Sequence, residues 1–373
     1  MKSFLYFFVL FISWNTFSQR ITQDNIKDLD LFLHTQVEKD KYFGFHVIIA
    51  QNDSILISKG YGKTNIEQNA KPTVNTLYRM ASMSKPVTTI AILKVCEENN
   101  IALDTPVSTH LNIVPDKTVT IRQMLSQTSG WGDWWNANHF EESYRKVTTH
   151  DYKSMEEFVL DYLKIPQIVP PGTSWHYGYS MEILAIWLEK VTSQSFTSYV
   201  DSNIFQPLGM FNSSYSFPNN HKCAYYHEKN DTGQWERKEP STINYFPGSG
   251  ALVSTASDYF TFCQMLYNMG EINGVRIVSQ EMINEMLTVV IGENGDIIPW
   301  QSGYGFALGV SVRINDKIAK MKGTLGDYGW LGYLGTSFWI DPEQKIIGIV
   351  LSQRPYDGYK LTQDVKNILY TQK

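Results

Sequence analysis

The position of the strand-like runs near both ends of the chain limits its fold most. Two runs rich in β-branched and aromatic residues, 45–50 and 55–58, are separated by an Asn-Asp pair that favours a hairpin turn. Two more, 336–340 and 345–352, are joined by a four-residue turn that contains proline. An isolated hairpin is only marginally stable in water. The two pairs therefore predict one sheet that is assembled from both ends of the chain.

Helical patterns fill most of the chain between these strands. A capping box begins one helix at Ser154. Apolar residues at helical spacing predict four more helices, at 84–99, 180–192, 258–268 and 361–370. We therefore expect an α/β (α+β) fold with a discontinuous sheet domain, 20–99 and 245–373, and a mainly helical domain, 100–244.

The first 19 residues have the layout of a cleavable signal peptide. A positively charged start precedes an apolar run over 4–12, and small and polar residues follow it. The run is too short to cross a bilayer, which needs roughly 20 apolar residues. We expect 1–19 to be removed, leaving a periplasmic or extracellular protein without stable membrane insertion. A buried N-terminal helix or an uncleaved anchor is the alternative.

Composition excludes several classes of function. The net charge of −5 is spread without long runs and predicts no nucleic-acid partner. The three cysteines fit neither a disulfide framework nor a zinc site, and no His/Cys cluster or phosphate loop indicates a metal or a cofactor. We expect a small-molecule substrate, and the sequence leaves the oligomeric state open.

A Ser-x-x-Lys pattern occurs twice, at Ser82–Lys85 and at Ser143–Lys146. It places an amine one helical turn from the hydroxyl, where the amine can take the hydroxyl proton. Ser143 lies in a charged stretch, whereas Ser82 begins the most apolar helix, whose first turn Pro86 fixes. Free N–H groups at that helix start can hold an oxyanion. A capping serine beside an ordinary lysine remains the alternative on these local features.

The segment Tyr78-Arg-Met-Ala-Ser-Met-Ser-Lys-Pro86 resembles the nucleophile segment of the serine β-lactamase and penicillin-binding superfamily. It is most similar to class C β-lactamases, D-alanyl-D-alanine carboxypeptidases and family VIII carboxylesterases. The resemblance implies a β-lactamase/DD-peptidase-like fold, with a central antiparallel sheet flanked by helices plus a mainly helical domain. It also implies Ser82 as nucleophile, Lys85 as its base, and no cofactor. The likeness continues in order at 103–107, 124–130, 171–173, 250–255, 270–274 and 338–342.

The resemblance implies further site residues on other segments. Tyr177 aligns with the family's tyrosine, which would pass the proton between nucleophile and leaving group. Tyr179 stands where the family often has a substrate-binding asparagine, and it is also the alternative for the tyrosine itself. The backbone N–H groups of Ser82 and Tyr333 are expected to form the oxyanion hole.

A third element indicates the substrate. β-Lactamases and carboxypeptidases carry Lys or His, then Thr, then Gly on the strand that edges the site. This chain has Trp330-Leu-Gly332, which resembles the Trp-x-Gly of the carboxylesterases. Loss of the cation and gain of an apolar wall favour a neutral substrate, and Gly332 would let that substrate approach closely. Arg354 remains a candidate for a positive contact, which keeps carboxylate-bearing substrates open.

These features together predict a secreted serine hydrolase, most specifically a carboxylesterase on small neutral esters. A β-lactamase or a D-amino-acid peptidase or amidase is the alternative, and a non-catalytic penicillin-binding-type sensor is the alternative from another class. The tryptophans Trp131, Trp134 and Trp135 wall the acyl pocket, pack in the core or form a lid.

Overall fold

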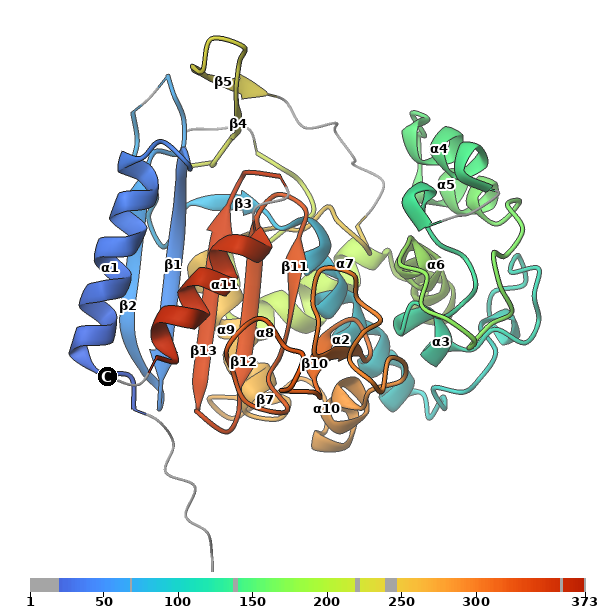
Figure 1. Cartoon of the computed structure of the whole chain (residues 1–373). Helices are drawn as coiled ribbons and strands as arrows, with labels where there is room; N and C mark the ends of the chain where they lie inside the picture. The colour runs from blue at the N-terminus through green and yellow to red at the C-terminus, as the bar shows by residue number, and fades with distance from the viewer. Residues whose placement is uncertain are drawn as a thin grey trace, which may run out of the picture.

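The computed structural model describes residues 20–67, 69–136, 140–218, 222–238, 247–355 and 358–371. The predicted signal peptide lies outside these ranges. The largest element is a seven-stranded antiparallel sheet in the order β2-β1-β13-β12-β11-β10-β9 (Figure 1). Its strands are β1 (Gly44–Gln51), β2 (Ser54–Gly62), β9 (Tyr304–Phe306), β10 (Ser311–Arg313), β11 (Tyr328–Gly332), β12 (Thr336–Asp341) and β13 (Ile346–Ser352).

The two ends of the chain pair with each other inside this sheet. β1 pairs with β13 from Phe45 opposite Ser352 to Gln51 opposite Ile346. β1 and β2 form one predicted hairpin, and β12 and β13 form the other. Both hairpins and the assembly of the sheet from both ends are therefore confirmed.

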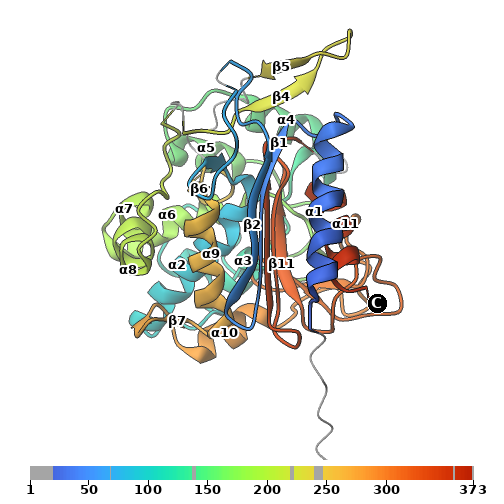
Figure 2. The same cartoon turned by 90° about the vertical axis from the view of Figure 1, so that its left-hand side faces the viewer.

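Helices cover both faces of the sheet, as the edge-on view shows (Figure 2). The side chains of β1 alternate between the two faces: Phe45, Val47 and Ile49 join one core, and Ile48 and Ala50 join the other. Burial on both faces explains why this strand is apolar at every position from Val47 to Ala50. One face carries α1 (Gln23–Glu38) and α11 (Gly358–Leu369), and the other carries α2 (Ser84–Glu98) and α9 (Ala256–Tyr267).

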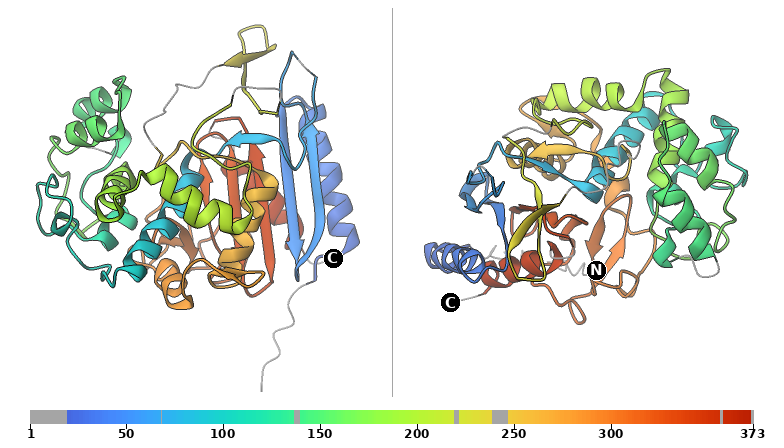
Figure 3. Two further views of the ribbon diagram at one scale, coloured as in Figure 1. Left: turned by 180° about the vertical axis from the view of Figure 1, so that it is seen from behind. Right: turned by 90° about the horizontal axis from the view of Figure 1, so that it is seen from above.

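The middle of the chain forms helices that lie to one side of the sheet, in green in both panels of Figure 3. The predicted helices at 84–99 and 180–192 are α2 and α6. The remaining helices are α3 (Ile121–Leu125), α4 (Glu141–Thr149), α5 (Met155–Tyr162), α6 (Ser180–Thr192), α7 (Phe196–Val200), α8 (Gln206–Leu208), α10 (Gln280–Leu287) and the short η1 (Ala81–Met83), η2 (Val107–Thr109), η3 (Trp134–Asn136) and η5 (Asp201–Phe205). Three two-stranded pairs complete the fold: β3 (Leu77–Arg79) with β6 (Val253–Thr255), β4 (Tyr226–Lys229) with β5 (Trp235–Lys238), and β7 (Glu271–Ile272) with β8 (Val275–Arg276).

Three observations bear on location and cofactors. Within the described ranges, no helix has the length and apolar character that a membrane span requires. The same ranges contain no group of three or more His, Cys, Asp or Glu side chains that could hold a metal ion. Cys96, Cys223 and Cys263 are all buried.

Candidate active site

Ser82 lies in the 3₁₀ turn η1, directly before helix α2. The preceding residue, Ala81, has a φ of +49°, which is uncommon for a residue with a Cβ and marks a strained turn. Lys85 and Pro86 lie in the first turn of α2, where the missing proline N–H would have had no helical partner. The local sequence therefore presents Ser82 on a strained turn at a helix start.

Lys85 joins this turn to two other segments. Its Nζ lies 3.4 Å from Ser82 Oγ and donates a hydrogen bond to the carbonyl of Ser249 at 3.2 Å. The same nitrogen lies over the ring of Tyr177, 4.4 Å from the ring centroid. The lysine is buried, with 3% of its surface exposed. This geometry places an amine within reach of the Ser82 hydroxyl proton.

The second Ser-x-x-Lys pattern has a different environment. Ser143 and Lys146 lie on α4, and the Lys146 side chain is 75% exposed beside Glu142. Water solvates this amine, so only the pattern at Ser82 is enclosed by other side chains.

Trp330 on β11 contacts the hydroxyl of Tyr177. Its indole N–H donates to the Tyr177 oxygen at 3.0 Å, and the ring centroids lie 5.4 Å apart. Trp330 is almost fully buried, and its role as an apolar wall of the substrate site stays a prediction. Because an indole can only donate, the Tyr177 hydroxyl accepts this bond and keeps its own proton for another partner.

Tyr179 packs away from this group, into the helical part of the chain. Its ring contacts Phe158 and Tyr162 of α5, at centroid distances of 5.4 Å and 5.9 Å. Burial, followed by the charge of Asp133, raises the pKa of the Tyr179 phenol well above its ordinary value. These contacts favour Tyr177 over Tyr179 as the tyrosine beside Lys85, and the predicted substrate contact of Tyr179 stays a prediction.

Gly332 brings the end of β11 against the nucleophile turn. A Cβ at this position would lie 2.4 Å from the carbonyl oxygen of Met80 and 2.1 Å from Thr336 Oγ1. These two atoms are hydrogen-bonded to each other at 2.8 Å. The protein's own packing therefore requires glycine here, and a substrate contact at Gly332 stays a prediction. Tyr333, which follows directly, has an exposed side chain.

The tryptophan patch divides between core and site. Trp131 is a core residue, buried and donating its indole N–H to the carbonyl of Ile165 at 2.9 Å. Trp135 is 40% exposed, and its ring lies 6.4 Å from that of Tyr177 and 5.8 Å from that of Trp300. The side chain of Trp134 lies outside the described part of the structure. Trp135 is thus the member of the patch that borders Tyr177.

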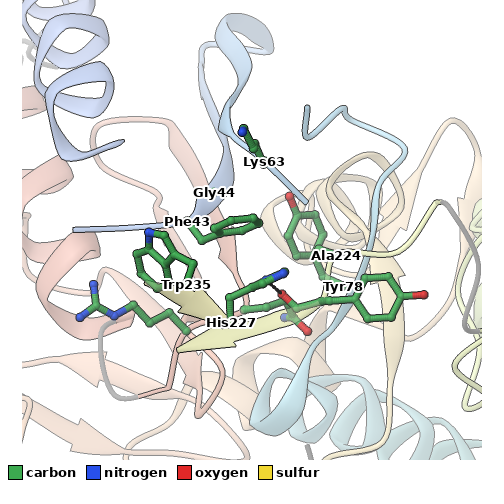
Figure 4. Close-up of a pocket in the computed structure, with 10 residues that line it drawn as sticks. Phe43, Gly44, Lys63, Tyr78, Ala224, His227 and Trp235 are labelled. Atoms are coloured by element: carbon green, nitrogen blue, oxygen red, sulfur yellow. Dashed lines mark hydrogen bonds between the residues drawn. The ribbon is translucent and has the colours of Figure 1, made fainter. Parts of the chain in front are cut away.

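A separate pocket includes Tyr78, the first residue of the segment that leads to Ser82, in its lining (Figure 4). Phe43, His227 and Trp235 are among the residues that line it, together with Tyr78 and Arg354. Phe43 stacks on His227 with centroids 3.8 Å apart, and the Arg354 guanidinium lies 6.0 Å from the centroid of Trp235. Its lining includes neither Ser82 nor Lys85. The structure therefore places Arg354 in the lining of this pocket, and a contact of Arg354 with a substrate stays a prediction.

Glu182 is a residue of this region that the sequence analysis did not predict. It lies on α6 with none of its surface exposed and accepts hydrogen bonds from the backbone N–H groups of Gly248 and Ser249. Burial raises the pKa of its carboxyl group to about 7, and the charge of Lys85 opposes this shift. The available signal was a lone acid within the apolar run from Met181 to Leu188.

The comparison with protein families identifies the class. The family model described as beta-lactamase matches residues 29–372. The chain therefore belongs to the β-lactamase family, which confirms the resemblance seen in the sequence. The members of this family are generally hydrolytic serine enzymes.

Individual relatives include proteins of different length. The protein flp of Staphylococcus aureus (strain N315) is 26% identical over 208 residues, 54% of this chain and 40% of flp. The esterase EstB of Burkholderia gladioli is 28% identical over 194 residues, 49% of each chain. The chain thus spans about half or less of the length of these curated relatives. The solved structure of EstCE1, described as a hydrolase with promiscuous acyltransferase activity, aligns with a TM-score of 0.84 and 20% identity, covering 94% of this chain and 99% of EstCE1. This structural likeness confirms the predicted fold.

Proposed function

We propose that this protein is a secreted serine hydrolase, specifically a carboxylesterase that acts on small neutral esters through an acyl-enzyme on Ser82. The observation that carries the choice of substrate is Trp330. Its buried indole occupies the position where family members that bind carboxylates carry a cation. An apolar wall whose N–H is already bound to Tyr177 suits an uncharged acyl group better than an anion. The esterase EstB among the relatives supports the same reading.

Three side chains carry the proposed reaction. The Ser82 oxygen attacks the ester carbonyl carbon while its proton passes to Lys85 Nζ, 3.4 Å away. The backbone N–H groups of Ser82 and Tyr333 hold the oxyanion. The C–O bond to the alcohol then breaks as Tyr177 gives its proton to the leaving oxygen and takes the proton that Lys85 holds, so that both groups return to their starting states. Water attacks the acyl-enzyme by the same route and releases the acid, which regenerates Ser82.

Initial rates on a p-nitrophenyl butyrate ester and on a chromogenic cephalosporin test this proposal. The wild type is compared with Ser82→Ala, and Ser143→Ala of the second Ser-x-x-Lys pattern is the matched control. We expect ester turnover that is lost in Ser82→Ala and retained in Ser143→Ala, with little cephalosporin hydrolysis. Ester turnover that survives Ser82→Ala would refute the assignment of the nucleophile.

The other outcomes identify the alternatives. Fast cephalosporin turnover would assign the protein to the β-lactamases, and cleavage of D-alanyl peptides without esterase activity would assign it to the peptidases. Intact-mass spectrometry after mixing separates an enzyme from a sensor. A Ser82 adduct that forms once and is not released over hours would indicate the sensor.

A further inference from the structure

Glu182 is a buried carboxylate that the proposed reaction leaves without a role. Its Oε1 accepts from the backbone N–H of Ser249 at 2.7 Å, and its Oε2 accepts from that of Gly248 at 3.1 Å. An ionised carboxylate has acceptor capacity on both oxygens, so it holds both N–H groups at once. A glutamine in its place would have only one acceptor atom for two donors.

The segment that Glu182 holds is the one that contacts helix α2. The carbonyl of Ser249 accepts from Lys85 Nζ at 3.2 Å, and the carbonyl of Gly248 accepts from Thr88 Oγ1 at 2.7 Å. A Cβ at position 248 would lie 2.6 Å from a backbone oxygen of α6, so this close approach requires glycine. Glu182 is therefore linked through Ser249 to Lys85 and through Gly248 to Thr88.

The charges around Glu182 make Lys85 its counterion. Two phenols act on the carboxylate, Tyr179 from the turn before α6 and Tyr215 from the segment after α8. Burial raises the pKa of both phenols above their ordinary values, so both stay neutral. Lys85 of α2 is the cationic side chain whose charge acts on Glu182 among the described residues. A negative charge near an amine favours its protonated form.

We propose that Glu182 is a positioning residue for Lys85, resting on the function proposed above. Its carboxylate holds the Gly248–Ser249 backbone against α2, and its charge stabilises the ammonium that Lys85 becomes when it takes the proton of Ser82. The aspartate of a Ser-His-Asp triad orients and stabilises its histidine in the same way. Glu182 does so from outside the reacting group, through backbone that carries one of the lysine's hydrogen bonds.

The pH dependence of Ser82 labelling by a fluorophosphonate probe tests this role. Labelling depends on the nucleophile and needs no knowledge of the natural ester. Rate constants are measured from pH 6 to 10 for the wild type, Glu182→Gln and Glu182→Asp. Glu189→Gln is the matched control, since Glu189 lies on the same helix and accepts one backbone N–H at 2.8 Å that a glutamine oxygen can also accept.

We expect Glu182→Gln to lower the plateau labelling rate about tenfold or more. The midpoint of the pH profile of labelling moves about one pH unit lower. The reason is that Lys85 then lacks the nearby negative charge that favours its protonated form. Glu182→Asp keeps the charge, so it retains the wild-type midpoint with a reduced rate. Glu189→Gln behaves as the wild type.

Wild-type rate and midpoint in Glu182→Gln would overturn the proposal. A slower rate with an unchanged midpoint would also overturn it, because Glu182 would then support the structure without its charge acting on Lys85. If Glu182→Gln does not fold, Glu182→Asp decides, and a wild-type rate in that variant overturns the positioning role. A wild type that the probe does not label, or labels equally in Ser82→Ala, refutes the proposed function instead.

Discussion

Replacing Gly332 by alanine would disturb the contact between β11 and the nucleophile turn. The new Cβ would lie 2.4 Å from the Met80 carbonyl oxygen and 2.1 Å from Thr336 Oγ1. Both atoms belong to one hydrogen bond of 2.8 Å, so relief of the overlap must lengthen or break it. Gly332 is not among the glycines with positive φ, so the damage comes from this overlap and not from the backbone conformation.

The stability cost follows from these two effects. Overpacking a well-filled site costs about 1–3 kcal/mol, and the loss of a hydrogen bond adds about 0.5–1.5 kcal/mol. The free energy of unfolding should therefore fall by about 2–4 kcal/mol. An unfolding entropy of about 2.1 cal/mol/K per residue over about 350 residues converts this into a Tm lowered by about 3–5 °C.

The activity cost follows from the oxyanion hole. Ser82 and Tyr333 lie on the two segments that the new methyl group pushes apart, and the proposed oxyanion hole requires their N–H groups to converge. Loss of one oxyanion donor lowers kcat by about 10²- to 10³-fold. We therefore expect Gly332→Ala to lose at least about 100-fold in kcat on the aryl ester at a temperature well below its Tm.

Differential scanning fluorimetry and steady-state ester kinetics measure the two effects, with Gly250→Ala as the matched control. A Cβ at Gly250 meets nothing within 4 Å, so that variant should keep the wild-type Tm and kcat. A wild-type Tm in Gly332→Ala would refute the packing argument. A lowered Tm with unchanged kcat would mean that the end of β11 does not position a donor of the oxyanion hole.

Three further predictions concern buried polar contacts. Trp330→Phe keeps an aromatic ring but removes the N–H that binds Tyr177, so kcat on the ester should fall about 2- to 12-fold. An unchanged kcat would mean that this hydrogen bond does not orient the phenol. Lys366 and Asp327 form a buried ion pair at 2.9 Å, so Lys366→Met should lower the free energy of unfolding, measured in urea, by about 3–5 kcal/mol. Adding Asp327→Leu should recover part of this loss. A loss below about 1 kcal/mol would contradict the argument that the unpaired carboxylate is buried away from water. The pKa of Glu182 is raised to about 7 by burial, so its ionisation opposes folding increasingly as pH rises from its ordinary value of 4.5 towards 7. Between pH 5 and 8 the wild type should lose about 2–3 kcal/mol relative to Glu182→Gln in urea unfolding, and equal pH dependence of the two proteins would refute the shift.

Local sequence determined the elements that depend on near neighbours. Strands β1, β12 and β13 and helices α2 and α6 begin and end within one residue of their predicted positions, because turn residues and apolar spacing act over a few residues. Strand β2 extends four residues beyond its predicted end. The approach of Lys85 to Ser82 follows in the same way from a spacing of three residues in one helical turn. The likeness to the β-lactamase family supplied the antiparallel sheet and the choice of a nucleophilic Ser82 over a capping serine.

Only the tertiary structure decided which distant side chains meet. The bond between Trp330 and Tyr177 joins residues 153 positions apart, and the bonds of Glu182 to the 248–249 backbone span 66 and 67 positions. The sequence predicted Trp330 as a wall but not as a hydrogen-bond donor, and it did not predict Glu182. Spacing along the chain determines which side chains share a face of one element, whereas the packing of β11, α2 and α6 determines which of those faces come into contact.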